Sequence, residues 1–597
     1  MCKFKFDLLR NKEPVGSIEC GKPMTYTFLV AQNVYAKRVL LVYLKDGSTD
    51  FQEVEMTLDA YDAGYKTYKA TIRFNSEGLY WYHFRVEGNQ NYIIQQGTQE
   101  NSICLSNEPN NSFSQLVTAK KVVMKLEEIG GVVYHIFVDR FNRSGKVEVR
   151  TGMKLKKSWN EPLADTDDFD VINKECYGGN LRGIIDKLDY IKSLNTKVIY
   201  LSPIFYAESY HKYDVADYEK VDPMFGSMSD LRELVKKAKE RDMIVILDGV
   251  FNHVGSDSKY FNMYGKFVGL GAYQSLKSKY VNWFNFYDWP DNYEKWWGVP
   301  SLPCLNESNK ELREYICGKN GIIEKYMKIG IGGFRLDVVD ELTDDFLTQI
   351  CQKIYSLNKN ALIIGEVWED AAKKVSYDHL RQYFWGHQLN SVTNYPLRSA
   401  ILKYIETGDA EEYNNCLNIV KDDYPKFVQN NLMNIIGSHD TSRIANEVER
   451  IDSAHKKELI KMASLLEYSF IGIPTIFYGD EVGVKNIKAN ISRTPYPWGN
   501  EDRSLLYWFK KLGEFRKLKS IVKGSMQLVK HSDGIIEIVR EEEEEKVIIV
   551  TNNSDSDYTL STDEKYYEII TGSTSSKNTF TVPSKGVLVI KRVTASK

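Results

Sequence analysis

The 597-residue sequence has few cysteines, and they form no recognisable metal-binding or disulfide pattern. The eight are scattered, with no C-x-x-C pair and no spacing typical of a zinc site. A chain of this length, with 43% apolar residues, buries a large core and needs no disulfide to hold its fold. We therefore expect free thiols in a reducing cytoplasm.

Long hydrophobic segments are also missing. The first residues contain no apolar stretch like that of a secretory signal peptide, and no later stretch offers roughly 18 uninterrupted apolar residues. Neither sign of charge dominates, since 78 Lys and Arg stand against 81 Asp and Glu. This balance gives no reason to expect a nucleic-acid or membrane partner. The sequence predicts a cytoplasmic protein without either.

Changes in sequence pattern predict an α/β fold with four domains. Residues 1–120 contain short β-type runs separated by turn residues, as in a β-sandwich. Residues 121–253 and 312–518 alternate eight nearly continuous apolar strand runs with amphipathic helical stretches, which predicts a (β/α)8 TIM barrel. Residues 254–311 interrupt it after strand 3 as an inserted domain rich in aromatic residues. Residues 519–597 return to short strands, which predicts a C-terminal β-sandwich.

Polar side chains stand where several predicted barrel strands end. The carboxyl ends of all eight strands meet at one mouth of a barrel, so residues there face one another. The acids come from separate strands, and no Ser–His or Cys–His pairing accompanies them. The strand-end residues are Asp248, Asn252 and His253 after the third strand, Arg335, Asp337, Asp340 and Glu341 after the fourth, Glu366 and Trp368 after the fifth, and His439 and Asp440 after the seventh.

Carboxylates from different strands suit cleavage of a glycosidic bond. An acetal needs a proton on its leaving oxygen and negative charge beside the developing oxocarbenium ion. If Asp337 and Glu366 lie about 5–5.5 Å apart, Asp337 attacks the anomeric carbon directly and the configuration is retained. Arg335, two residues before Asp337 on one strand face, is expected to help keep that carboxylate ionised. Glu366 follows the apolar run LIIG, which favours a raised pKa and the proton-donor role.

Four segments resemble the signature regions of an enzyme family. DGVFNH (248–253), GFRLDVVDE (333–341), GEVWED (365–370) and GSHD (437–440) are similar in order and position to those of the α-amylase family of glycoside hydrolases. SLPCLN (301–306) resembles the M-P-K-L-N segment of its neopullulanase, cyclomaltodextrinase and maltogenic amylase branch. With the β-rich N-terminal domain, the resemblance covers nearly the whole chain.

The resemblance implies a role for each matching residue. Asp337 is the expected nucleophile, Glu366 the general acid/base, and Asp440 the carboxylate that holds the distorted sugar in the transition state. Asp248 is expected to brace the site from behind, and His211 is left open between a site role and a core role. The implied substrate-binding residues are Tyr213, His253, Arg335, Trp368 and His439.

No metal or other cofactor is expected. Asn180 stands where the family's Asp often helps to bind calcium, and no acidic cluster follows DRFNRSG (139–145). Hard cations need several oxygen ligands, preferably charged ones, so calcium does not fit this sequence well. Leu302 and Cys304 replace Met and Lys in the branch-marking segment, which leaves the preferred substrate open.

The resemblance implies a retaining hydrolase of α-1,4-glucosidic bonds in maltodextrins, cyclodextrins or pullulan, acting through a covalent glucosyl-enzyme intermediate. Two alternatives stay open: a 4-α-glucanotransferase that uses the same carboxylates, and a catalytically silent barrel that serves as a glucan sensor or scaffold. The expected partner is an α-glucan oligosaccharide. By analogy with the branch, we also expect a homodimer in which the N-terminal domain of one subunit narrows the other's cleft.

Overall fold

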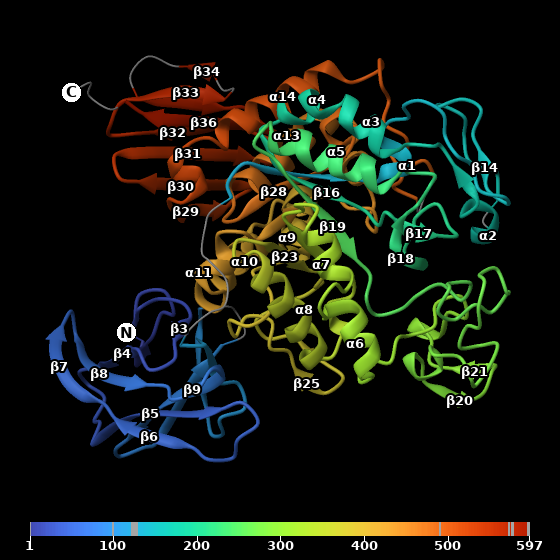
Figure 1. The fold of residues 1–597 in the computed structure, drawn as a ribbon. Helices are drawn as coiled ribbons and strands as arrows, with labels where there is room; N and C mark the ends of the chain where they lie inside the picture. Colours follow the sequence, from blue (N-terminus) through green and yellow to red (C-terminus); the bar gives the residue numbers. More distant parts are fainter. Residues whose placement is uncertain are drawn as a thin grey trace. The chain divides into compact units, whose positions relative to one another are not determined.

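The computed structural model divides into two compact units, of which the first is Met1–Lys125 with Glu369–Leu389 and Glu411–Gln429, and the second is the rest of the chain (Figure 1). No helix within the described ranges is both long enough and apolar enough to span a membrane. The described residues are 2–97, 101–120, 129–166, 168–488, 491–570, 573–574 and 578–593.

Eight parallel strands close into a barrel in the second unit, as the sequence predicts. They are buried along almost their whole length, because side chains fill the barrel interior and helices cover its outside. The predicted TIM-barrel fold is confirmed. In order around the barrel the strands are β13 (Val132–Ile136), β16 (Thr196–Leu201), β19 (Ile244–Gly249), β22 (Gly333–Leu336), β23 (Leu362–Gly365), β26 (Ser391–Asn394), β27 (Met433–Ile435) and β28 (Ile473–Phe477).

Helices lie between most of these strands (Figure 1). In α5 (Met228–Lys239) a capping box defines the start: the Ser227 hydroxyl accepts from the Asp230 N–H, and the Asp230 carboxylate accepts from the Ser227 N–H. The first apolar run is shorter as a strand than predicted, because β13 ends at Ile136 and Val138–Phe141 form the short helix α1. The other barrel helices include α3 (Leu181–Asp186), α4 (Leu188–Lys192), α6 (Lys310–Cys317), α7 (Ile322–Met327), α8 (Asp344–Leu357), α9 (Tyr395–Thr407), α12 (Ile444–Ile451), α13 (Lys456–Ser469) and α14 (Arg503–Phe515).

A long excursion between β19 and β22 corresponds to the predicted insertion. Its short elements include β20 (Phe286–Asp288) and β21 (Asn292–Tyr293). Tyr260 and Trp283 are buried, with rings stacked at 5.4 Å between centroids. Aromatic residues thus form the small core of this segment, whereas Trp297 is 77% exposed.

Antiparallel strands form the C-terminal part of the second unit, as predicted. A five-stranded sheet has the order β29 (Ser525–Ser532), β30 (Ile535–Glu542), β31 (Glu545–Asn552), β36 (Gly586–Arg592) and β33 (Tyr566–Ile570). A second sheet contains β32 (Tyr558–Ser561), β35 (Thr579–Val582) and β34 (Ser573–Thr574). Buried Val550, Leu560, Phe580 and Leu588 share the core of this domain. The acidic run Glu541–Glu545 forms the tip of the β30–β31 hairpin, with Glu542 paired to Glu545.

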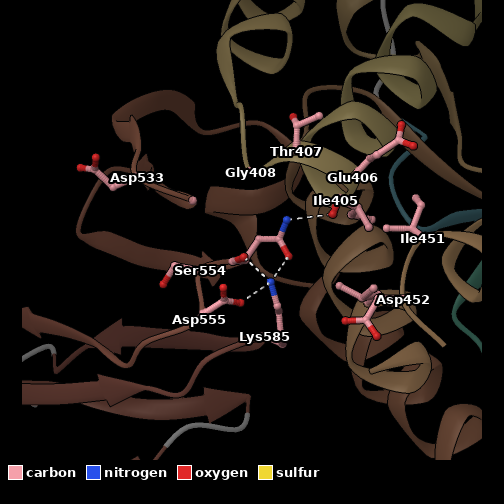
Figure 2. Close-up of a pocket in the computed structure, with 13 residues that line it drawn as sticks. Ile405, Glu406, Thr407, Gly408, Ile451, Asp452, Asp533, Ser554, Asp555 and Lys585 are labelled. Carbon is pink, nitrogen blue, oxygen red and sulfur yellow. Dashed lines mark hydrogen bonds and ion pairs between the residues drawn. The ribbon is translucent and has the colours of Figure 1, made fainter. Parts of the chain in front are cut away.

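A polar pocket of about 490 Å³ lies where α9 meets this C-terminal domain, as Figure 2 shows. Asn553 Nδ2 donates to the carbonyl oxygens of Tyr404 and Ile405, at 2.7 and 2.9 Å. These carbonyls belong to the last turn of α9, where the Tyr404 carbonyl also accepts from the Gly408 N–H at 2.8 Å. Lys585 Nζ donates to the Asn553 carbonyl at 2.6 Å and pairs with Asp555. Asn553 therefore joins the barrel to the C-terminal sheet.

Two antiparallel sheets form the core of the first unit. One contains β4 (Pro23–Ala31) and β8 (Tyr65–Arg73), and the other contains β5 (Arg38–Lys45) and β9 (Gly78–Glu87). Alternate residues of β4 are buried, as expected for a strand with one face on a core. Phe28 and Phe84 stack at 4.4 Å between centroids. The predicted N-terminal sandwich is confirmed as a fold.

The first unit also contains segments predicted as barrel connections. Ser114 Oγ donates to Asp423 Oδ1 at 3.0 Å, and the buried Lys12 ammonium pairs with Asp422, both on α10 (Glu411–Asp423). Buried ion pairs hold partners in place because leaving either charge alone in the interior is costly. The predicted limits of the four domains stay predictions.

Removing the amide of Asn553 is expected to destabilise the second unit. Asn553→Ala deletes two hydrogen bonds to buried carbonyls, so the free energy of unfolding should fall by about 2 kcal/mol. Asp555→Ala, at a neighbouring side chain that is 97% exposed, should change it by less than about 0.5 kcal/mol. Denaturant titration of the two variants gives the comparison; equal effects would contradict the role of Asn553.

Candidate active site

One pocket of about 510 Å³ contains seven of the eight predicted site residues. The eighth, Arg335, lies buried next to it and contacts two of the pocket carboxylates. Asp340 and Glu341 line the pocket too, as expected. The lining residues are Phe169, Asn173, His211, Tyr213, His253, Trp296, Trp297, Leu302, Asp337, Val338, Asp340, Glu341, Glu366, Trp368, His439, Asp440 and Arg493.

The buried guanidinium of Arg335 contacts three carboxylates from three neighbouring strands. Its Nη1 lies 2.9 Å from Asp248 Oδ1 and 2.6 Å from Asp337 Oδ1. Its Nη2 lies 2.9 Å from Glu366 Oε2. The register pairs Asp248 with Arg335 across β19 and β22, so these contacts follow directly from strand pairing. One positive charge thus joins the predicted nucleophile and the predicted acid.

Burial dominates the ionisation of Asp337. Its removal from water raises its pKa well above the ordinary value, and the nearby charges of Glu366 and Asp248 act in the same direction. Arg335 opposes this shift, as the sequence predicts, but does not outweigh burial. One guanidinium cannot neutralise three carboxylates, so the cluster favours keeping a proton.

Glu366 is held at both carboxylate oxygens. Its Oε2 accepts from the Val338 backbone N–H at 2.9 Å and forms an ion pair with Arg335 Nη2 at 2.9 Å. Its Oε1 accepts from Trp368 Nε1 at 3.2 Å. The side chain is only 6% exposed, and these contacts fix its orientation towards the pocket.

Asp440 has the opposite electrostatic environment. Burial disfavours its charge, but contacts with His439 and Arg493 outweigh this effect and hold its pKa well below the ordinary value. Its Oδ2 lies 2.9 Å from His439 Nε2, and its Oδ1 lies 3.4 Å from Arg493 Nη2. A third of the side chain remains exposed in the pocket. Asp440 is therefore ionised at neutral pH.

Tyr213 connects two of these groups through its hydroxyl. The oxygen donates to Asp248 Oδ2 at 3.0 Å and lies 2.5 Å from His439 Nε2. The rings of Tyr213 and His439 are parallel within 4°, with centroids 5.2 Å apart. Asp248 also accepts from the buried Tyr200 hydroxyl at 2.5 Å, so three residues contact this carboxylate: Tyr200, Tyr213 and Arg335. His211 accepts from the Tyr213 N–H, which ties it to the pocket loop.

His253 is buried against the inserted segment. Its ring stacks on Trp296 at 5.1 Å between centroids, and its Nδ1 lies 3.2 Å from Asn252 Nδ2. Burial lowers the pKa of His253 to about 4, so the ring is neutral at pH 7. Its buried Nε2 has no hydrogen-bond partner among the described residues, which leaves that nitrogen able to bond to a ligand.

Two exposed tryptophans line the pocket. Trp368 is 45% exposed and stacks on Tyr395 with centroids 3.8 Å apart. Trp297 stacks on Trp296, and its Nε1 donates to Glu341 Oε1 at 3.1 Å. Flat faces of this kind suit the apolar faces of sugar rings.

Sequence reasoning missed several pocket residues, above all Arg493, Val338 and Trp297. Arg493 follows β28 in a long connection, and nothing in its neighbouring sequence marks it as facing the barrel mouth. The only signal for Arg493 is its positive charge beyond the eighth strand, which does not by itself show that it faces the pocket. Val338 and Trp297 both have left-handed backbones, which sequence patterns do not reveal for such residues.

The residues around Asn180 do not suit calcium. Asn180 Nδ2 donates to the Ser144 carbonyl, and its Oδ1 accepts from the Gly183 N–H, both at 2.8 Å. The nearby Asp139 carboxylate is paired with Arg140 and accepts from two backbone N–H groups. These oxygens are thus already used by protein donors, and the described residues contain no group of three or more His, Cys, Asp or Glu arranged to hold a metal ion.

Comparison with known proteins agrees with the fold and the pocket. Residues 135–503, well over half of the chain, match the model of the alpha-amylase catalytic domain. The chain belongs to the alpha-amylase family. The family resemblance seen in the four sequence segments is thereby confirmed. In this family member, residues 534–592 also match the model of the beta-galactosidase C-terminal domain.

Similar proteins cover different shares of this alpha-amylase family chain. It is 32% identical to an amylopullulanase of Thermoanaerobacterium saccharolyticum over 582 residues, which cover 86% of the chain but only 44% of that protein. The chain thus spans less than half the length of this relative. It is 32% identical to a cyclomaltodextrinase of Thermoanaerobacter pseudethanolicus, with 75% of each protein covered. The solved type III pullulan hydrolase from Thermococcus kodakarensis has a TM-score of 0.69 at 25% identity, with 99% of this chain and 100% of that one covered.

Acid should destabilise the protein through His253. Unfolded histidine binds a proton near pH 6.5, whereas folded His253 does so only near pH 4, so stability falls as pH drops through this window. The contribution of this group is about 3 kcal/mol. Unfolding titrations from pH 7 to 4 should show a shallower loss for His253→Gln, and an unchanged one for His379→Gln at an exposed histidine. Identical slopes for all three proteins would contradict the assignment.

Chelation should leave the fold unaffected. Because Asn180 and Asp139 are occupied by protein donors, we expect EDTA treatment to change neither the melting temperature nor the activity. Paired thermal scans with and without added CaCl2 supply the measurement. A rise in melting temperature with added calcium would show that a cation binds the folded protein.

Proposed function

We propose that the protein is a retaining glycoside hydrolase that cleaves α-1,4-glucosidic bonds of maltodextrins, cyclodextrins or pullulan. The observation that carries this proposal is the pair Asp337 and Glu366, joined by one buried guanidinium in the pocket that Asp440 also enters. Two adjacent carboxylates in different environments can divide the acid and nucleophile roles. Among the described residues of this pocket, no other two carboxylates are joined by a buried guanidinium in this way.

In the first step, Glu366 gives its proton to the glycosidic oxygen while Asp337 attacks the anomeric carbon. The bond to the leaving sugar breaks, and an ester between Asp337 and the glucosyl unit forms. The raised pKa of Asp337 reflects the free pocket; when the proton of the cluster is on Glu366, Asp337 is ionised and Arg335 stabilises it.

In the second step, Glu366 takes a proton from water, which attacks the anomeric carbon and releases Asp337. The two inversions together retain the configuration. Asp440 supplies a permanent negative charge near the oxocarbenium-like transition state, because His439 and Arg493 keep it ionised. Tyr213 and His253, with a free ring nitrogen on the latter, are the proposed contacts to the reacting glucose.

Substrate, location and assembly belong to the same proposal. Relatives named cyclomaltodextrinase and amylopullulanase support an α-glucan substrate. The eight cysteines are free thiols, which supports a reducing, cytoplasmic location. A homodimer through the N-terminal domain rests on the family resemblance, and light scattering of the purified chain tests it.

Glucanotransfer is a second candidate that one observation favours. The exposed faces of Trp297 and Trp368 offer a stacking surface on which an acceptor sugar can compete with water. Both reactions use the same covalent intermediate, so they differ only in the acceptor. A silent glucan-binding role is less well supported, because Asp337 and Glu366 both contact Arg335 and Asp440 lines the same pocket.

Replacing the proposed nucleophile tests the enzyme directly. Asp337→Asn should lower kcat by at least about 10³-fold on maltotriose, β-cyclodextrin, pullulan and starch, because no ester can form. Asp345→Asn makes the same chemical change at an exposed residue of α8 and should leave kcat unaltered. Residual turnover above a tenth in Asp337→Asn would exclude the nucleophile role.

The same incubations distinguish the two candidates. Products resolved by size and anomeric form should be short α-anomers from the hydrolase, whereas longer oligosaccharides from maltotriose would indicate transfer. β-Anomers as first products would contradict a retaining mechanism altogether.

A further inference from the structure

Val338, directly after the proposed nucleophile, has an unusual backbone. Its φ of 40° and ψ of 54° place it in the left-handed region, which a β-branched residue rarely adopts. It is the only β-branched residue with a positive φ in the described part of the chain. Strain of this kind persists only where surrounding structure enforces it, and it is concentrated at functional sites.

The left-handed turn aims one backbone group at the proposed acid. Val338 follows the end of β22 and leads into the short helix η3 (Val339–Glu341). In this conformation its N–H donates to Glu366 Oε2 at 2.9 Å. Arg335 Nη2 lies 2.9 Å from the same oxygen. Glu366 Oε2 therefore accepts one hydrogen bond from the strained turn and lies against the positive charge of Arg335.

The two oxygens of Glu366 are thereby made unequal. An oxygen that accepts a hydrogen bond and lies beside a guanidinium is the poorer place for a proton, because the proton would face that positive charge. Among the described residues, Oε1 accepts only from Trp368 Nε1, at a longer 3.2 Å, and it keeps a lone pair. A protonated Glu366 thus carries its hydrogen on Oε1.

We propose that Val338 is a positioning residue whose left-handed backbone N–H, with Arg335, fixes Oε2 of Glu366 and so makes Oε1 the oxygen that delivers the catalytic proton. The proposal rests on the hydrolase function proposed above. In bond cleavage the Oε1–H bond breaks and the glycosidic oxygen gains the proton, which leaves Glu366 as a carboxylate. In hydrolysis of the ester, Oε1 takes a proton from water and the acid is restored.

Deleting the N–H alone provides the sharpest test. Val338 is replaced by its α-hydroxy acid, so that a backbone ester takes the place of the amide and the isopropyl group stays. A lost donor to the carboxylate favours the neutral acid, so the basic limb of the kcat/KM profile should move up by about one pH unit. Maltotriose turnover at neutral pH should fall about tenfold or more, because the proton is no longer held in place.

A matched control lies one residue beyond the acid. The Val367 N–H donates to Thr393 Oγ1 at 3.2 Å, not to Glu366. The same ester at Val367 should leave the basic limb unmoved. An aryl α-maltoside with a good leaving group needs little protonation, so the Val338 ester should largely spare its turnover. An unmoved limb, or equal losses on maltotriose and the aryl substrate, would overturn the proposal.

Two ordinary variants keep the question decidable if the ester protein does not fold. Val338→Gly accommodates φ of +40° without strain but frees the turn, whereas Val338→Ala keeps a Cβ and its restriction. We expect maltotriose turnover to fall more in Val338→Gly than in Val338→Ala, with the basic limb shifted in the glycine variant. Activity equal to the unmodified protein in Val338→Gly would contradict a positioning role. If Asp337→Asn loses its turnover while the Val338 variants keep theirs, this inference alone is rejected. If turnover survives in Asp337→Asn, the proposed function itself is rejected.

Discussion

The contact on which the site depends is the buried guanidinium of Arg335 among three carboxylates. It links Asp248 on β19, Asp337 after β22 and Glu366 after β23. Removing such a charge from water is unfavourable, and only close carboxylates with good geometry offset that cost. The strand register supplies this geometry, because parallel neighbours place Asp248 beside Arg335 and Arg335 beside Ile364. The strand pairing that closes the barrel therefore also sets the positions of Arg335 and its three carboxylates.

Differences between the acids arise from what surrounds them. Burial raises the pKa of Asp337, while His439 and Arg493 hold that of Asp440 low despite its burial. The pocket thus combines a permanent negative charge with a cluster that can keep and move one proton. The strained turn at Val338 adds a directional constraint on Glu366 that side-chain charges alone do not supply. The barrel strands thus position the acids, the contacts of Asp440 keep it charged, and the turn at Val338 sets the direction of the proton on Glu366.

Much of this arrangement could be predicted from the sequence. Eight apolar runs indicated the barrel, and the polar residues after the third, fourth, fifth and seventh runs do meet in one pocket. The family indicated by those residues is confirmed by the match over 135–503. Arg493, Trp297 and Val338 were missed, because they belong to connections whose paths depend on contacts made far along the chain. The effect of Arg335 on the ionisation of Asp337 was predicted, but the larger effect of burial was not. Local sequence does not show how deeply a side chain is buried.

The sequence by itself determined the order of strands and helices, the identity of the acids and their place at strand ends. Periodic apolar residues settle these features locally, because burial of one face selects helix or strand. Only the tertiary structure decided which oxygen of Glu366 is held by Val338, which cation keeps Asp440 charged and which connections line the pocket. These depend on distances between connections that follow different barrel strands, 28 residues apart for Val338 and Glu366 and 53 for Asp440 and Arg493, and such distances exist only once the barrel has closed.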